Sequence, residues 1–173
     1  MNNYQSFYIR LEEPLFDKYS APPEDPLGEL SDFEMGIRRF CFERNHRVSI
    51  QIGNERIFVF LDPDICMILD RLPQQVSELA QDKRVEIIFA ENCLLVIEFL
   101  PLKHKFLCIL KEFGHSSKSK QFELDKSQVL RVLKRFLYEV VQLAMDGGYI
   151  KPEEKNEFLS PAFPTDASVV FPA

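Results

Sequence analysis

The most constraining feature of this sequence is an extended stretch that is apolar on both of its faces. Between residues 93 and 113, CLLVIEFLPLKHKFLCILKEF, fifteen of twenty-one residues are apolar when Pro and Cys are counted. Successive side chains of a strand point to opposite faces. The apolar side chains of a strand over 105–113 therefore divide between them: Phe106, Cys108 and Leu110 on one face, Leu107, Ile109 and Phe113 on the other. Such a strand needs cover on both faces, so one face must meet a helix and the other a further segment or a second molecule.

The alternation of apolar and polar residues along the chain predicts an α+β fold with an antiparallel sheet. We expect two three-stranded meanders, at about 37–61 and 85–113, and helices at about 62–82 and 125–146 that cover them. The segment 114–123, GHSSKSKQFE, is predicted to be a polar loop.

The best-defined local prediction is a hairpin closed by Gly53-Asn54. Both residues tolerate the positive φ that a two-residue hairpin loop requires. The loop sets the register, and the expected partners share one face: Ile50 with Ile57, and Val48 with Val59.

Helix boundaries are marked by capping residues. Asp62 followed by Pro63 is typical of an N-cap and a first helical position, and Pro73 is expected to end or kink that helix. Asp125 is the expected N-cap of the long helix, and Gly147-Gly148 its left-handed C-cap. Apolar residues at helical spacing define the face that this helix buries: Val129, Leu133, Phe136, Val140 and Leu143, widened by Leu130, Leu137, Val141 and Ala144.

A chain of 173 residues is long enough for one domain with a sizeable core. We assign residues 1–150 to a single α+β domain, which includes an acidic arm at 1–36 with a strand at 4–12 and a Pro-rich connector. Residues 151–173 are predicted to form an extended, Pro-rich tail that lies along the body through its phenylalanines: Phe158, Phe163 and Phe171.

Charge is distributed unevenly. The net charge is −6, and residues 1–36 carry eight acidic and two basic residues, whereas 103–135 carry nine basic and three acidic ones. An acidic total argues against a dedicated nucleic-acid binder. The basic residues around His104 and on the long helix, with Tyr138 nearby, are too sparse to track phosphates, and a solvated helix face explains them.

The cysteines do not form a recognisable site. They are separated by 25, 27 and 15 residues, a spacing without the close pairs of a zinc site and unlike a disulfide framework. Cys66 follows a helix start, but its apolar surroundings would raise the pKa of its thiol and favour a core role. We expect no metal and no cofactor. The absence of a long apolar run, of a signal-peptide pattern and of a glycosylation sequon fits a cytoplasmic protein with no membrane segment.

Two glutamates are candidates for acid-base chemistry. A two-residue turn at Glu91-Asn92 would place Glu86 opposite Ile97, one residue from Glu98. Two buried carboxylates side by side would raise one pKa, but such residues more often face solvent and protect a sheet from aggregation. With no phosphate loop, nucleophile elbow or dinucleotide fingerprint, the sequence leans away from an enzyme without excluding one.

We therefore expect a non-enzymatic protein-binding or regulatory domain, in the manner of an acidic antagonist or immunity protein, whose partner the sequence does not name. The candidate contact residues lie on the acidic arm and on the second apolar face of the 105–113 strand: Glu12, Glu13, Asp17, Glu24, Asp25, Leu107, Ile109 and Phe113.

One alternative is a module or enzyme that binds a small apolar ligand between the sheet and the long helix. Its polar groups would come from Glu98, His104 or Tyr138, and phenylalanines would line the pocket. A homodimer that pairs the 105–113 faces of two copies is compatible with either hypothesis.

Overall fold

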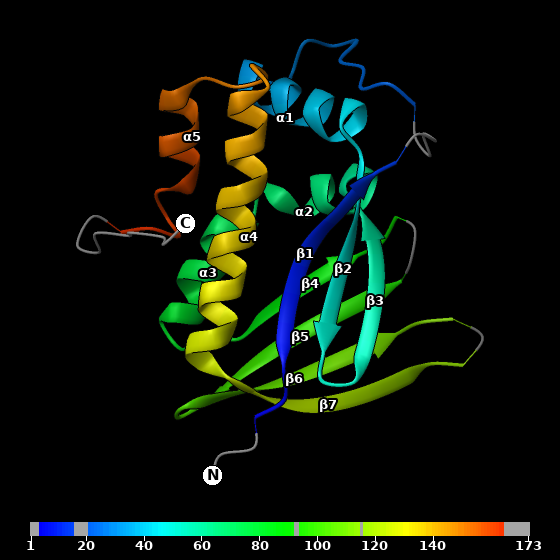
Figure 1. Cartoon of the computed structure of the whole chain (residues 1–173), viewed down its shortest axis with the longest axis vertical. Coiled ribbons are helices and arrows are strands. Elements are labelled where there is room, and N and C mark those ends of the chain that lie inside the picture. Colours follow the sequence, from blue (N-terminus) through cyan, green and yellow to red (C-terminus); the bar gives the residue numbers. More distant parts are fainter. Residues whose placement is uncertain (1–3, 16–20, 92–93, 115, 165–173) are drawn as a thin grey trace.

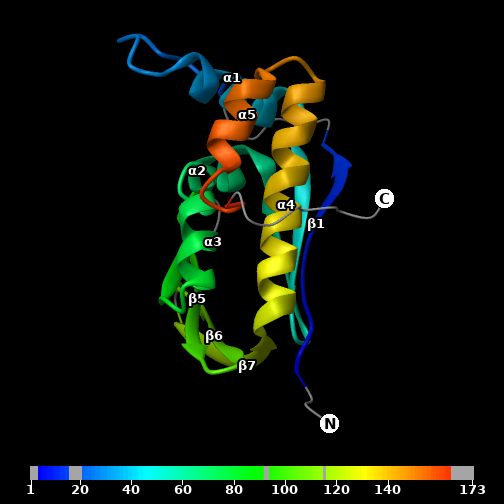
Figure 2. The ribbon, with the colours of Figure 1, turned by 90° about the vertical axis from the view of Figure 1, so that its left-hand side faces the viewer.

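The structure is a computed structural model that describes residues 4–15, 21–91, 94–114 and 116–164 (Figure 1). In this part of the chain, two antiparallel sheets and five α-helices form an α+β fold, as predicted. The three-stranded sheet has the order β1-β2-β3, and the four-stranded sheet the order β4-β5-β6-β7. Figure 2 shows the long helix α4 (Lys126–Asp146) running beside β1, with the four-stranded sheet on its other side.

The three-stranded sheet contains β1 (Phe7–Pro14), β2 (His46–Ile52) and β3 (Glu55–Phe60). The hairpin between β2 and β3 is confirmed, with Ile50 opposite Ile57 and Val48 opposite Val59. Gly53 has a φ of 59°, the left-handed conformation that the turn requires. The sheet differs from the predicted meander because its third member is β1, the strand predicted near the N-terminus.

The prediction of a strand at 37–44, the first of that meander, is wrong, because these residues belong to helix α1 (Asp32–Glu43) and its C-cap. The Ser31 hydroxyl accepts the Glu34 N–H at 3.2 Å, and the Glu34 carboxylate accepts the Ser31 N–H at 2.8 Å, which completes a capping box. Ile37, Phe40 and Cys41 are buried at helical spacing. The short-range alternation of IRRFCFER hid this period of 3.6.

The four-stranded sheet contains β4 (Val85–Phe89), β5 (Leu95–Leu102), β6 (Lys105–Glu112) and β7 (Lys118–Asp125). β7 lies where the sequence predicted a polar loop, so that prediction is wrong. Only Phe122 and Leu124 of this strand are buried, and its first half is held by the backbone ladder to β6, which leaves no apolar pattern in the sequence.

The predicted helix over 62–82 is broken into three pieces: a single π-helical turn η1 (Leu61–Ile65), α2 (Cys66–Leu69) and α3 (Leu72–Ala80). Asp62, within this segment, has an extended backbone, and its N–H and C=O bond to the Asn45 side chain at 2.9 and 3.2 Å. Pro73 stands in the first turn of α3, so it starts a helix as well as ending one.

The long helix begins as predicted, because the Asp125 carboxylate accepts the Gln128 N–H at 2.7 Å. Its buried face follows the predicted stripe apart from Leu143, which is 39% exposed. After the helix ends, Gly148 adopts a φ of 76°.

The C-terminal segment is not extended throughout: α5 (Pro152–Leu159) packs beside α4 (Figure 1). Phe158 contacts Phe33 at 4.9 Å between ring centroids, and Phe163 contacts Tyr138 at 6.4 Å, so both phenylalanines dock as predicted. Phe171 lies outside the described residues.

The core lies between the inner faces of the two sheets, closed by α4 and the η1–α3 segment. Phe7 of β1 meets Phe99 of β5 at 5.8 Å, and Phe99 meets Phe106 of β6 at 6.0 Å, all edge to face. At one end Gln5 joins the sheets directly: its N–H donates to the Glu123 carbonyl at 3.0 Å.

Gly36 fixes the distance between α1 and the connection from α4 to α5. A Cβ built there would lie 2.2 Å from the Tyr149 carbonyl oxygen. Gly36→Ala should therefore lower the free energy of unfolding by about 2 kcal/mol through overpacking, even though alanine is the better helix former by about 1 kcal/mol. Urea unfolding measures this.

The matched control is Gly114→Ala, because a Cβ at Gly114 meets nothing within 4 Å. Equal stability of the Gly36→Ala variant and the parent would show that α1 does not approach this connection so closely.

Candidate functional site

The first candidate surface is the outer face of the four-stranded sheet. The strand alternation turns Leu107 and Ile109 to this face, where both are half-buried, while Phe106, Cys108 and Leu110 lie in the core. Pairing across the strands extends the apolar strip to neighbours on β4 and β5: Ile88, Val96 and Leu100. In Figure 2 no element of the described chain covers this side of the sheet. Phe113, just beyond β6, is 49% exposed.

A buried carboxylate stands in the middle of this outer face. The Glu98 side chain is 5% exposed, and its two oxygens contact Lys111 Nζ and Arg84 Nε, each at 2.6 Å. Arg84 also contacts Glu86 at 2.7 Å. The hydrogen bond from Lys111, with the charges of Lys111 and Arg84, lowers the pKa of Glu98 below its ordinary value.

The register corrects one prediction about these glutamates. Glu86 stands directly opposite Glu98, not opposite Ile97. The two carboxylates share the Arg84 guanidinium, so the raised pKa that acid-base chemistry would need is absent from Glu98. The cluster is an ion-pair network on the open face of the sheet.

The three polar residues predicted for a ligand pocket lie in different places. Glu98 points away from the long helix, His104 is exposed in the β5–β6 turn, and Tyr138 contacts Lys155 of α5. Between the sheets and α4, the core side chains leave a cavity of about 10 Å³. That volume is close to the lower limit for one water molecule, so this cavity is too small for an apolar ligand, and the predicted pocket stays a prediction.

Some carboxylates of the acidic arm already form ion pairs or hydrogen bonds within the chain. Glu12 contacts Arg56 at 3.1 Å, and hydrogen bonds from Ser49 and Arg56 lower its pKa. The Asp25 carboxylate accepts the N–H groups of Glu29 and Leu30 at 2.9 and 3.0 Å. Glu13 and Glu24 are exposed, and Asp17 lies outside the described residues. The role of these acids in binding stays a prediction.

The second candidate surface is the outer face of the three-stranded sheet, which the sequence reasoning missed. We call it the arginine-aromatic face, and its exposed side chains are Tyr8 and Arg10 of β1, Arg47 of β2, and Arg56 and Phe58 of β3. Arg47 and Arg56 stack on the Phe58 ring at 4.6 and 5.0 Å from its centroid. Arg10 stacks on Tyr8 at 5.3 Å.

Much of this face remains open to a partner. Tyr8 is 41% and Phe58 43% exposed. Arg56 is paired with Glu12, whereas neither Arg10 nor Arg47 forms an ion pair with a carboxylate among the described residues. Beside the edge strand, Tyr8 and Arg10 also border a hollow of about 340 Å³ against Arg135 and Glu139 of α4.

A signal for the arginine-aromatic face was present in the sequence. The alternation that identified the buried residues of β2 and β3 also defines the opposite, outward set, RxSxQ and RxFxF. What the sequence did not reveal is that β1, with Tyr8 and Arg10, pairs with β2.

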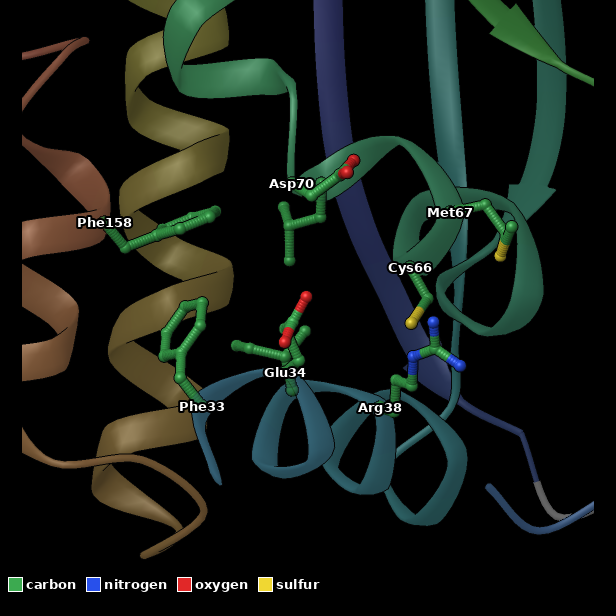
Figure 3. A pocket seen from close by; sticks show the side chains of 9 residues that line it. Phe33, Glu34, Arg38, Cys66, Met67, Asp70 and Phe158 are labelled. Carbon is green, nitrogen blue, oxygen red and sulfur yellow. The ribbon is translucent and has the colours of Figure 1, made fainter. Parts of the chain in front are cut away.

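A third site is a pocket between α1, α2 and α5 (Figure 3). Its cavity measures about 130 Å³, and its lining combines apolar and charged side chains: Phe33, Glu34, Ile37, Arg38, Cys66, Met67, Leu69, Asp70 and Phe158. Cys66 is partly exposed, and its thiol lies close enough to that of the buried Cys41 to raise the pKa of Cys41. We call this site the helix pocket.

The described residues contain no group of three or more His, Cys, Asp or Glu side chains arranged to hold a metal ion. Nor does any helix in the described ranges combine the length and the apolar character needed to cross a membrane. No protein-family model, curated protein or solved structure matches this chain.

The Glu98 network predicts a defined pH dependence of stability. Because the folded state lowers the pKa of Glu98, its contribution is present above the unfolded pKa and is lost as the pH falls through the folded pKa. Glu98→Gln should lower the free energy of unfolding at neutral pH by about 1.5 kcal/mol. The difference should shrink as the pH is lowered toward 3, a trend that denaturant unfolding at several pH values would measure.

Glu123→Gln is the matched control, since the Glu123 side chain is 56% exposed and pairs only at the surface with Lys105. That substitution should change stability by less than about 0.5 kcal/mol. A Glu98→Gln variant with an unchanged pH profile would show that the network does not hold this carboxylate ionised.

Proposed function

We propose that this chain is a non-catalytic protein-binding domain whose arginine-aromatic face docks an acidic segment of a partner protein. The observation that carries the proposal is a set of stacked arginine and aromatic side chains, half-exposed on an open sheet. Two of its arginines, Arg10 and Arg47, form no ion pair within 4 Å among the described residues, although the charge of Arg47 acts on Glu12, in a chain with a net charge of −6.

The composition of the face favours a protein partner. Arginine and aromatic residues are enriched in the cores of protein interfaces, and lysine is depleted there. The arginine-aromatic face has three arginines and two aromatics and, among its outward residues, no lysine. The guanidinium groups of Arg10 and Arg47 lie over aromatic rings, and an arginine can make paired hydrogen bonds with a carboxylate.

Local charge favours an acidic segment. With Glu12 counted, the three arginines leave the face a formal charge of +2 on a molecule that is otherwise acidic. Opposite charge on the two partners steers their encounter and fixes their register. The negative charge elsewhere would repel an acidic partner, so binding should be confined to this face.

Single-stranded nucleic acid fits less well. Bases stack on open aromatic rings, but Phe58 and Tyr8 already have guanidinium groups over them at 4.6 to 5.3 Å. A charge of +2 is also small for a surface that must track a phosphate backbone. We place the binding activity in the cytoplasm, because the cysteine spacing does not form a disulfide framework.

Nuclear magnetic resonance titration of the labelled protein tests the proposal with two probes: a synthetic peptide rich in Glu and Asp, and oligothymidylate of equal formal charge. The peptide should shift amide resonances of β1–β3, and Arg10→Glu with Arg47→Glu should weaken binding by about tenfold or more. Lys83→Glu, an equal charge change at an exposed site after α3, is the control. Tighter binding of the oligonucleotide to this face, or no binding of the peptide, would overturn the proposal.

A second candidate is self-association through the outer face of the four-stranded sheet. Its charged groups pair with one another: Arg84 with Glu86 and Glu98, Lys111 with Glu98, and Lys105 with Glu123. Three cations and three carboxylates make the face neutral. A neutral aliphatic face suits a second copy of itself in a two-fold arrangement.

Analytical ultracentrifugation would test this second candidate. If a dimer forms, replacing both Leu107 and Ile109 with lysine should convert it to a monomer without loss of helix signal. Leu143→Lys, at an exposed position on α4, should leave the dimer intact. A parent protein that sediments as a monomer across the accessible concentration range would exclude this surface as a stable homodimer interface.

A further inference from the structure

The fold brings together two cysteines, one of which lines the helix pocket. Cys41 lies on the buried face of α1 and is 0% exposed, whereas Cys66 is the first residue of α2 and is partly exposed. They are 25 positions apart in the sequence, yet their thiols lie close enough that each changes the pKa of the other. Two thiols in contact can form a disulfide, which most buried cysteines cannot do because they have no neighbouring thiol.

Only Cys66 of this pair is reachable from solvent through the pocket. It lines the cavity of about 130 Å³ that opens between α1, α2 and α5. Figure 3 shows its sulfur directed toward α1, with the Arg38 guanidinium beside it. Cys41 is fully buried, so its thiol would react with a product formed at Cys66 and not with an oxidant from solvent.

The surroundings favour the thiolate at Cys66. The hydrogen bond donated by Cys41 is the main cause that lowers the pKa of Cys66, and the positive charge of Arg38 acts in the same direction against burial, Asp62 and Asp70. The same hydrogen bond and burial raise the pKa of Cys41. The thiolate is the reactive form of cysteine, so the exposed member of the pair is also the nucleophilic one.

We propose that Cys66 and Cys41 form an oxidisable dithiol that a hydroperoxide converts to a disulfide. The Cys66 thiolate attacks one peroxide oxygen, the O–O bond breaks, and the released alkoxide or hydroxide takes up a proton to leave as alcohol or water. Cys66 becomes a sulfenic acid. The Cys41 thiol then attacks the Cys66 sulfur, the S–S bond forms and water leaves. In total, two thiols and one hydroperoxide give one disulfide, one alcohol or water, and one further water.

The disulfide would join α1 to the start of α2 and remove the thiol from the wall of the helix pocket. It would also close a loop that includes the β2–β3 hairpin, which carries Arg47, Arg56 and Phe58. A cross-link restricts the unfolded chain and raises stability where native geometry accepts it. This inference does not rest on the proposed binding function, since it concerns other residues and another surface.

The chain supplies its own reference for an inert cysteine. Cys108 lies in the core of β6 with no exposed surface, and burial raises its pKa to about 12. If Cys41 and Cys66 only fill space, they should resist oxidation as Cys108 does. Cys93 lies outside the described residues, so the test uses the full chain with Cys93→Ser, which leaves Cys41, Cys66 and the reference Cys108.

The experiment exposes this reduced protein to stoichiometric hydrogen peroxide, blocks remaining thiols by alkylation and maps the peptides by mass spectrometry. We expect a loss of two hydrogen atoms, a linked peptide pair containing Cys41 and Cys66, and an alkylated Cys108. In the Cys41→Ser and Cys41→Ala variants, oxidation should stop at a Cys66 sulfenic acid, which dimedone traps. Two variants are used in case one of them fails to fold. Cys108→Ser should form the disulfide normally.

The role of Arg38 gives a second readout. Arg38→Met should slow oxidation several-fold at neutral pH and move the midpoint of the pH–rate profile upward, because a cation favours the thiolate. Arg39→Met, one residue along the same helix and paired with Glu43, should leave the profile unchanged. The proposal would be overturned if Cys41 and Cys66 stayed as reduced as Cys108. It would also be overturned if, in the protein that retains Cys93, Cys66 first formed a disulfide with a cysteine other than Cys41.

Discussion

The contact of Phe7 with Phe99, continued to Phe106, is the interaction on which the rest of this fold depends. These rings are at most 1% exposed and join β1 of one sheet to β5 and β6 of the other. Burying aromatic side chains of this size is among the largest single contributions that a core residue makes. Because the aromatic contact fixes the two inner faces against each other, it also determines which residues are left on the two outer faces.

The outer faces have different chemical characters, and both follow from strand alternation. On the three-stranded sheet, β2 and β3 alternate buried aliphatic residues with arginine and phenylalanine. On the four-stranded sheet, β5 and β6 alternate core residues with leucine, isoleucine and a single paired glutamate. One sheet therefore presents a net positive charge, whereas the other presents aliphatic groups and charges that neutralise one another.

The sequence predicted well wherever one local rule determined the structure. The Gly53-Asn54 turn set the hairpin register, and Asp125 marked the start of α4. It predicted poorly where tertiary context decided. Residues 37–43 alternate over a few positions but are buried with a helical period, and most of β7 is polar because only its backbone ladder holds it in the sheet. Similarly, the pairing of Glu98 with Arg84 and Lys111 depends on strand register, which no motif in the sequence encodes.

The opposed placement of the two sheets has a consequence for how many molecules this chain can hold. Since their inner faces share one core, the outer faces point in opposite directions (Figure 2). A ligand on one face would not obstruct a ligand on the other, so occupancy of the two would be sterically independent. If both faces were used, the chain would bridge two partners. If those partners were themselves linked, the second binding event would become intramolecular and would occur at a high effective concentration. A domain of 173 residues would then bring two proteins together across the thickness of a single core.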